Sequence, residues 1–133
     1  MNLEALGTAW APRLLGVLRF MTGLMLLQHG LGKIFKFPVI PAFTKLDLGS
    51  MPGIAGFFEL IGGALLVVGL FSRPAAFIVS GMCAVGYFTV HAQRGFYPIL
   101  NGGELIALYC FVFLYIAAAG AGPWSIDATM RRK

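Results

Sequence analysis

The chain has 133 residues and a formal net charge of +5; 59% of its residues are hydrophobic and only 11% are charged. A water-soluble domain carries about 25% charged residues, so this composition excludes an ordinary soluble protein and indicates a surface that mostly contacts lipid. No basic patch alternates with aromatic residues that could stack on bases, which excludes nucleic-acid binding.

Four apolar segments follow one another along the chain. The length of each is close to that of a membrane-spanning helix, which needs about 20 residues to cross the hydrocarbon core of a bilayer. The first is expected at residues 12–32, because Ala11-Pro12 is a favourable helix start. No basic residue precedes Arg13, which argues against a cleavable signal peptide. The other three are expected at residues 54–71, 74–92 and 102–121.

The connections between these segments predict the topology. Short connections make consecutive helices antiparallel neighbours, while the longer loop 33–52 is expected to lie in the membrane interface. We therefore predict an all-α fold, a four-helix transmembrane bundle in which residues 1–133 form one domain. Four crossings place both termini on one side. The positive-inside rule then predicts a multi-pass protein of the cell membrane with cytoplasmic termini.

Two glutamates are the most informative polar residues, since Glu59 and Glu104 each stand just inside an otherwise apolar run. A carboxylate at bilayer depth costs about 2.5–3.5 kcal/mol on insertion scales, so it normally faces the protein interior and has a partner or a function. Antiparallel threading brings both glutamates to the same membrane face as His29 and His91, which end the first and third segments. We expect these four side chains to share one pocket.

Helical periodicity makes a further prediction about which faces point inward. On the third segment Tyr87 lies on the same face as His91. On the fourth segment, the face predicted to point inward carries Glu104, Leu108, Phe111 and Tyr115.

Three interpretations of this cluster remain open. In the first, the Glu and His side chains satisfy one another and only hold the helices together. In the second, they form a proton-handling or quinone head-group site. In the third, His29, His91 and the glutamates bind a single metal ion, but the chain lacks the Glu-x-x-His motif of helical di-metal proteins and no metal is expected.

The second interpretation assigns roles to individual residues. The candidate catalytic residues, which would accept or relay protons, are Glu59, Glu104 and His91. The candidate ligand-binding residues are His29, Tyr87, and the cations Lys33 and Arg94, which would attract polar or anionic ligands at the mouth of the site.

Three further residues inside apolar segments need an account. Arg19 lies ten residues before His29, about 15 Å deeper along a helix, so it requires a partner. Asp127 is the natural candidate, and we predict a structural Arg19–Asp127 ion pair. Cys83 and Cys110 form no Cys-x-x-Cys motif and are expected to pack in the core without a disulfide.

The order and spacing of these motifs resemble the DoxX family of small four-helix membrane proteins. The resemblance extends from about residue 13 to residue 127. The motifs that carry it are Arg19 with Gly23, Gly30-Leu-Gly32-Lys33, Gly56-Phe-Phe-Glu59-Leu-Ile-Gly-Gly63, Gly69-Leu-Phe-Ser-Arg73, His91, Asn101-Gly-Gly-Glu104 and Gly120-Ala-Gly-Pro-Trp-Ser-Ile-Asp127.

The resemblance implies a fold more than an activity. Some members of that family are linked to quinone chemistry, as membrane subunits of a thiosulfate:quinone oxidoreductase or in quinone and catechol resistance, and others assemble or anchor partners. We therefore expect a quinone-interacting accessory subunit that receives electrons from a redox partner subunit, because the chain has no haem, flavin or dithiol motif. The rival is a non-catalytic scaffold or assembly factor. A solute transporter is a third class, and it would require a homo-oligomer.

Overall fold

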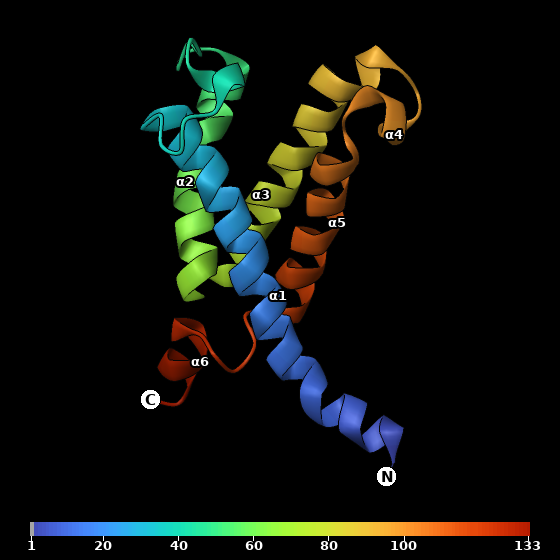
Figure 1. Ribbon diagram of the computed structural model, residues 1–133. Coiled ribbons are helices and arrows are strands. Elements are labelled where there is room, and N and C mark those ends of the chain that lie inside the picture. The colour runs from blue at the N-terminus through green and yellow to red at the C-terminus, as the bar shows by residue number, and fades with distance from the viewer. Residues whose placement is uncertain (1) are drawn as a thin grey trace.

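A computed structural model describes residues 2–133, which contain helices and loops but no strands (Figure 1). The elements in chain order are α1 (Leu3–Ile34), the 3₁₀ turn η1 (Pro41–Phe43), α2 (Met51–Val68), α3 (Ser72–Gly86), the π-helical turn η2 (Tyr87–His91), the 3₁₀ turn η3 (Ala92–Arg94), α4 (Pro98–Asn101), α5 (Glu104–Ala119) and α6 (Ile126–Arg131). The four long helices α1, α2, α3 and α5 match the four predicted segments, so the all-α prediction is confirmed.

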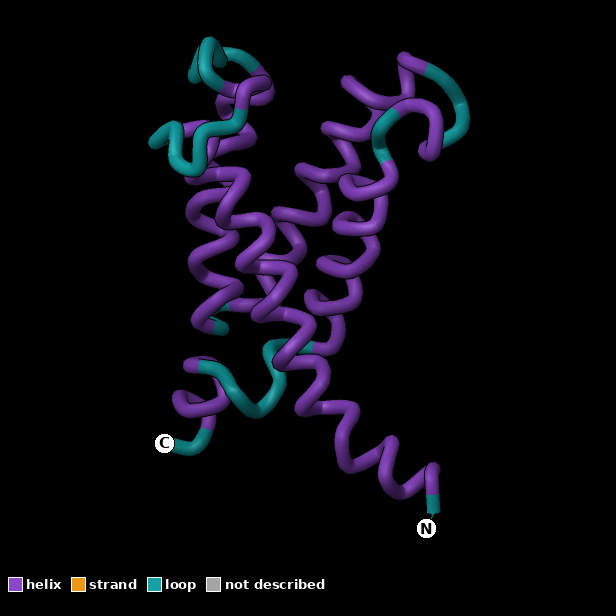
Figure 2. The backbone as a smooth tube through the Cα atoms, in the orientation of Figure 1, coloured by secondary structure: helices purple, strands orange, loops and turns teal. Residues whose placement is uncertain are grey.

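Three of these helices are long and apolar enough to cross a membrane: α1, α2 and the continuous helix Ser72–Arg94 formed by α3, η2 and η3. The fourth, α5, is an apolar helix of 16 residues that runs antiparallel to α3. Both termini lie at one end of the molecule, and the two long loops lie at the other end (Figure 2).

The first helix begins earlier than predicted. Its N-cap is Asn2, whose side-chain oxygen accepts hydrogen bonds from the N–H groups of Glu4 and Ala5. Pro12 therefore lies inside α1 instead of at its start. An internal proline removes one hydrogen bond of the helix and crowds the preceding turn, and the side-chain cap at Asn2 supports the turns before it.

The helices form two hairpins, α1–α2 and α3–α5, which join through the α2–α3 turn. Glycines let α1 and α2 approach closely, as is common for helices in membranes. A Cβ atom added at Gly63 of α2 would lie 2.7 Å from the backbone nitrogen of Leu27 in α1. A Cβ atom added at Gly30 of α1 would likewise collide with the backbone of Leu60.

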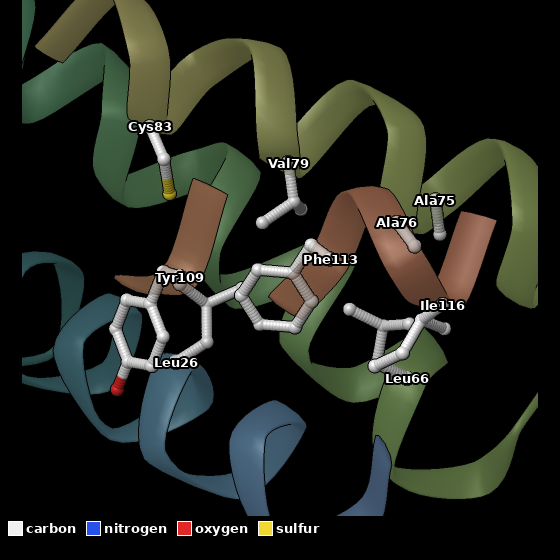
Figure 3. Close-up of a cluster of buried hydrophobic side chains, with 9 residues drawn as sticks. All are labelled: Leu26, Leu66, Ala75, Ala76, Val79, Cys83, Tyr109, Phe113 and Ile116. Carbon is white, nitrogen blue, oxygen red and sulfur yellow. The ribbon is translucent and has the colours of Figure 1, made fainter. Parts of the chain in front are cut away.

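A compact hydrophobic core forms where the two hairpins meet (Figure 3). Its buried members come from all four long helices: Leu26, Leu66, Ala75, Ala76, Val79, Cys83, Tyr109, Phe113 and Ile116. Cys83 and Cys110 are free thiols in and beside this core. The outer faces of the same helices expose many large apolar side chains, as expected for a surface in contact with lipid.

We expect Gly63→Ala to destabilise the protein, because the new methyl group meets backbone atoms of α1 that cannot move without separating the helices. Overpacking of this kind costs about 1–3 kcal/mol. The matched control is Gly81→Ala in α3, where an added Cβ atom has no neighbour within 4 Å. Unfolding of both variants in detergent measures the effect, and equal stabilities would contradict the proposed close packing.

Candidate functional site

A buried ion pair joins the end of α1 to α2. Lys33 Nζ lies 2.9 Å from Glu59 Oε1, and the two residues are 7% and 8% exposed. Gly56 creates the space for the lysine stem, because a Cβ atom there would lie 3.0 Å from Lys33 Cβ. The ring of Phe43, from the loop between the helices, lies 5.2 Å from Lys33 Nζ and covers the pair.

Two buried polar atoms beside this pair have no hydrogen-bond partner within residues 2–133: Glu59 Oε2 and the hydroxyl of Tyr109. Tyr109 belongs to α5, and its edge-to-face contact with His29 of α1 has a ring separation of 6.5 Å. Tyr109 and Glu59 are both buried, and Tyr109 belongs to the hydrophobic core where the two hairpins meet. We call His29, Lys33, Glu59 and Tyr109 the inner polar cluster.

The unpaired atoms make this cluster unusual. A buried donor or acceptor without a partner costs about 1–3 kcal/mol, and most such groups in native proteins are satisfied. A third unpaired atom in the described chain, Ser72 Oγ, lies at the opposite end of the helices, where α3 begins. The inner polar cluster therefore has free capacity to bind one more hydrogen-bonding group.

The other predicted site residues form a separate group at the loop end of the α3–α5 hairpin. His91 Nδ1 lies 3.1 Å from the carbonyl oxygen of Asn101, and the His91 ring stacks on Tyr87. Asn101 is 2% exposed, and its amide donates to the Tyr87 hydroxyl and to the Gly95 carbonyl. Its Oδ1 accepts a hydrogen bond from Gly103 N–H. These bonds fix the turn that leads into α5.

Glu104 and Arg94 are both exposed at this end of the molecule. No hydrogen bond or ion pair within residues 2–133 connects Glu104 or His91 to the inner polar cluster. The structure thus brings together Glu59, His29 and Lys33, and it leaves the remaining predicted residues on the second hairpin.

The predicted inward face of α5 is wrong. All four residues of that predicted face, including Phe111, are exposed, and the buried face carries Tyr109, Phe113 and Ile116. The reason is that α5 is apolar on all sides, so its periodicity does not identify the packed face. The spacing of Tyr109 and Phe113, at i and i+4, is the sequence signal that could have identified it.

The predicted ion pair between Arg19 and Asp127 is replaced by bonds to the backbone. Arg19 is 2% exposed, and all of its guanidinium hydrogen bonds go to carbonyl oxygens. The acceptors are Ala121 at 2.9 Å, Val67 at 3.0 Å, Trp124 at 2.6 Å and Leu66. The last carbonyl groups of a helix such as α2 have no hydrogen-bond donor within the helix. The guanidinium of Arg19 supplies the missing N–H donors.

Asp127 accepts hydrogen bonds from the backbone N–H groups at the start of α3, which have no acceptor within the helix. Its two carboxylate oxygens accept hydrogen bonds of 2.9 Å from the N–H groups of Phe71 and Ser72. Its own N–H donates to the carbonyl of Gly69, the residue that ends α2 in a left-handed conformation. Both charged side chains therefore hold the α2–α3 turn against the C-terminal segment, without contacting each other as an ion pair.

The metal interpretation has no support from this arrangement. Within residues 2–133, no three His, Cys, Asp or Glu side chains gather closely enough to hold a metal ion. Tyr109 is the residue of the inner polar cluster that the sequence did not reveal.

We expect Glu59→Gln to destabilise the protein by about 3–5 kcal/mol, since it leaves the buried Lys33 ammonium without a countercharge. The double variant Lys33→Met/Glu59→Met removes both charges, so most of this loss should be recovered. Thermal or denaturant unfolding in detergent measures the three proteins. A double variant as unstable as the single one would show that the charges do not stabilise each other.

We expect Asp127→Asn to lower stability at neutral pH by about 1 kcal/mol, because an amide has one acceptor oxygen for two N–H groups and carries no negative charge at the N-terminus of α3. Partial burial alone would raise the pKa of Asp127, but the hydrogen bonds from Ser72 and Phe71 and the charge of Arg131 outweigh it and lower the pKa. Because the pKa of Asp127 is lower in the folded than in the unfolded protein, its ionised form stabilises the fold at pH values above the unfolded-state pKa of about 3.9. This stabilisation is lost as the pH falls through the folded-state pKa.

The unfolding curves of the wild type and Asp127→Asn should therefore converge as the pH falls below about 4. Glu4→Gln, which neutralises an exposed carboxylate on α1, is the control and should change little at any pH. A difference between wild type and Asp127→Asn that persists unchanged in acid would contradict the capping role.

Comparisons with known proteins agree with this architecture. The DoxX family pattern matches residues 14–92. A protein of Haemophilus influenzae described as uncharacterized is 40% identical, over 99% of this chain and 98% of the relative. A second uncharacterized protein of the same organism is 30% identical, over 74% of this chain and 61% of the relative. No solved structure matches. The chain belongs to the DoxX family, and it is an integral membrane protein.

Proposed function

We propose that the protein is a quinone-interacting accessory subunit of a membrane oxidoreductase, and that the inner polar cluster binds the quinone head group. The observation that supports this proposal is the pair of buried, unpaired polar atoms, Glu59 Oε2 and the Tyr109 hydroxyl. They lie among apolar helices, beside the hydrophobic core, and in this proposal the isoprenoid-bearing quinone approaches them from the lipid.

The chemistry of these groups fits both redox states of a quinone. A quinone carbonyl accepts hydrogen bonds, and the Tyr109 hydroxyl can donate one. A hydroquinone hydroxyl donates hydrogen bonds, and the free oxygen of Glu59 can accept one. The ammonium of Lys33, already bound to the other carboxylate oxygen, keeps the group oriented.

Proton transfer completes the proposed role. Reduction of a quinone to a hydroquinone consumes two electrons and two protons. A partner subunit supplies the electrons, and Glu59 and His29 are the groups of the inner polar cluster that can carry protons. In this proposal Glu104, His91, Tyr87 and Arg94 belong to the exit toward water, since Glu104 and Arg94 are exposed at the loop end of the helices. The distribution of basic residues favours cytoplasmic termini.

A second candidate is a non-catalytic scaffold or assembly factor. The observation that favours it is the Lys33–Glu59 pair itself, because a buried carboxylate with an adjacent ammonium can serve structure alone. In that case the exposed apolar faces of the helices would contact a partner protein or a second copy of the chain.

The substitution Tyr109→Phe separates the two candidates. It removes an unpaired buried hydroxyl, so it should leave stability unchanged or slightly increased. It should nevertheless weaken binding of a short-chain ubiquinone or menaquinone analogue about threefold to tenfold, the value of one hydrogen bond. Quenching of intrinsic fluorescence in lipid nanodiscs measures the affinity, and thermal unfolding measures stability.

Tyr115→Phe is the matched control, because Tyr115 is an exposed tyrosine on the same helix. It should bind the analogue as the wild type does. Equal affinity of Tyr109→Phe and the wild type, or no saturable binding by the wild type, would favour the scaffold over the quinone site.

A further inference from the structure

Both termini lie at the end of the molecule opposite to the long loops (Figure 1). A basic cavity is formed at this end, and none of its lining residues belongs to the inner polar cluster. Its volume is about 480 Å³, and it is lined by Ala9, Pro12, Arg13, Pro123, Trp124 and Arg132. One wall is therefore α1, and the other consists of the segment that connects α5 to α6 together with Arg132, which directly follows α6.

The two walls are held together by direct contacts. A Cβ atom added at Gly122 would lie 2.9 Å from the carbonyl oxygen of Pro12 and 3.0 Å from the nitrogen of Gly16, so the connecting segment lies directly on α1. The guanidinium of Arg19 binds the carbonyl oxygens of Ala121 and Trp124 and fixes the same segment. The cavity is thus preformed by packing and hydrogen bonds.

The positive charge of the cavity is not neutralised by the protein. Within residues 2–133 the structure contains a single ion pair, Lys33–Glu59, at the opposite end of the helices. Neither Arg13 nor Arg132 therefore has a carboxylate within 4 Å. Asp127, the acidic residue of α6, is occupied by the N–H groups at the start of α3.

Arg13 is held in position by its neighbours on α1. Its guanidinium lies 5.4 Å from the centre of the Trp10 ring, and its Nη1 atom donates to the carbonyl of Ala9. Those contacts leave further N–H groups of Arg13 free to bind an anion.

We infer that this cavity binds the phosphate of an anionic phospholipid. Trp10 and Trp124 are exposed at the same end of the molecule, and tryptophans of membrane proteins collect at the level of the lipid head groups. Two guanidinium groups match the oxygens of a phosphodiester, and basic pockets beside membrane helices are suited to lipid head groups. The apolar lining from Ala9, Pro12 and Pro123 fits the glycerol of a lipid better than free phosphate.

A bound lipid would join the two walls. It would connect α1 through Arg13 to the chain's C-terminal part through Arg132, and so stabilise the segment that carries two acceptors of Arg19. Because it binds only the folded protein, the lipid should raise the unfolding temperature.

The test compares purified protein in nanodiscs of phosphatidylcholine with and without phosphatidylglycerol. Phosphatidylglycerol should raise the Tm of the wild type, and native mass spectrometry should detect one retained lipid. The double variant Arg13→Gln/Arg132→Gln should lose at least half of the Tm shift and the retained lipid. If this variant does not fold, Arg132→Gln alone serves, because Arg132 is exposed at the end of α6.

The matched control is Lys45→Gln/Lys133→Gln, which removes the same charge from two exposed residues outside the cavity. It should keep the shift and the lipid. An equal loss in the control would show general attraction to an anionic surface and overturn the proposed site. A second arm adds inorganic phosphate to phosphatidylcholine nanodiscs: a shift equal to that of phosphatidylglycerol would assign the cavity to free phosphate instead.

Discussion

The guanidinium of Arg19 is the interaction on which most of the structure depends. It lies fully buried in α1 and donates to carbonyl oxygens at the end of α2 and in the segment that follows α5. Hydrocarbon offers these carbonyls no alternative donor, so one side chain replaces the solvation that water provides elsewhere. The α1–α2 packing, the α2–α3 turn and the wall of the basic cavity all meet at this residue. An ammonium group, with three donors and no planar fork, could not make the same set of bonds.

Both hairpins contribute side chains to the inner polar cluster. The α1–α2 hairpin supplies His29, Lys33 and Glu59, and the α3–α5 hairpin supplies Tyr109. The inner polar cluster therefore exists only where the hairpins meet, and its member Tyr109 also belongs to the hydrophobic core that joins them (Figure 3). At this junction Glu59 Oε2 and the Tyr109 hydroxyl have no hydrogen-bond partner. The packing of the surrounding apolar side chains offsets the cost of burying them.

Much of this arrangement could be predicted from the sequence, because apolar runs of membrane length specify helices and their number specifies where the termini lie. The burial of Glu59 followed from the cost of a carboxylate inside an apolar segment. Other features could not be predicted, for identifiable reasons. The acceptors of Arg19 are backbone carbonyls, which carry no sequence signature. The packed face of α5 was hidden because this helix is apolar all round, so Tyr109 was overlooked and Glu104 was expected to point inward. The start of α1 was misjudged because Pro12 suggested a boundary that Asn2 provides.

The location of Tyr109 has a mechanical consequence. Glu59 belongs to the α1–α2 hairpin and Tyr109 to the α3–α5 hairpin. A molecule that forms hydrogen bonds with both side chains would therefore link the two hairpins across an otherwise apolar interface. Its binding strength then depends on the angle between the hairpins, and anything that changes that angle, including bilayer thickness or a neighbouring protein, tunes the affinity from a distance. Occupancy would in turn stiffen the joint between the hairpins, so that one small ligand could report on the state of the whole membrane-embedded assembly.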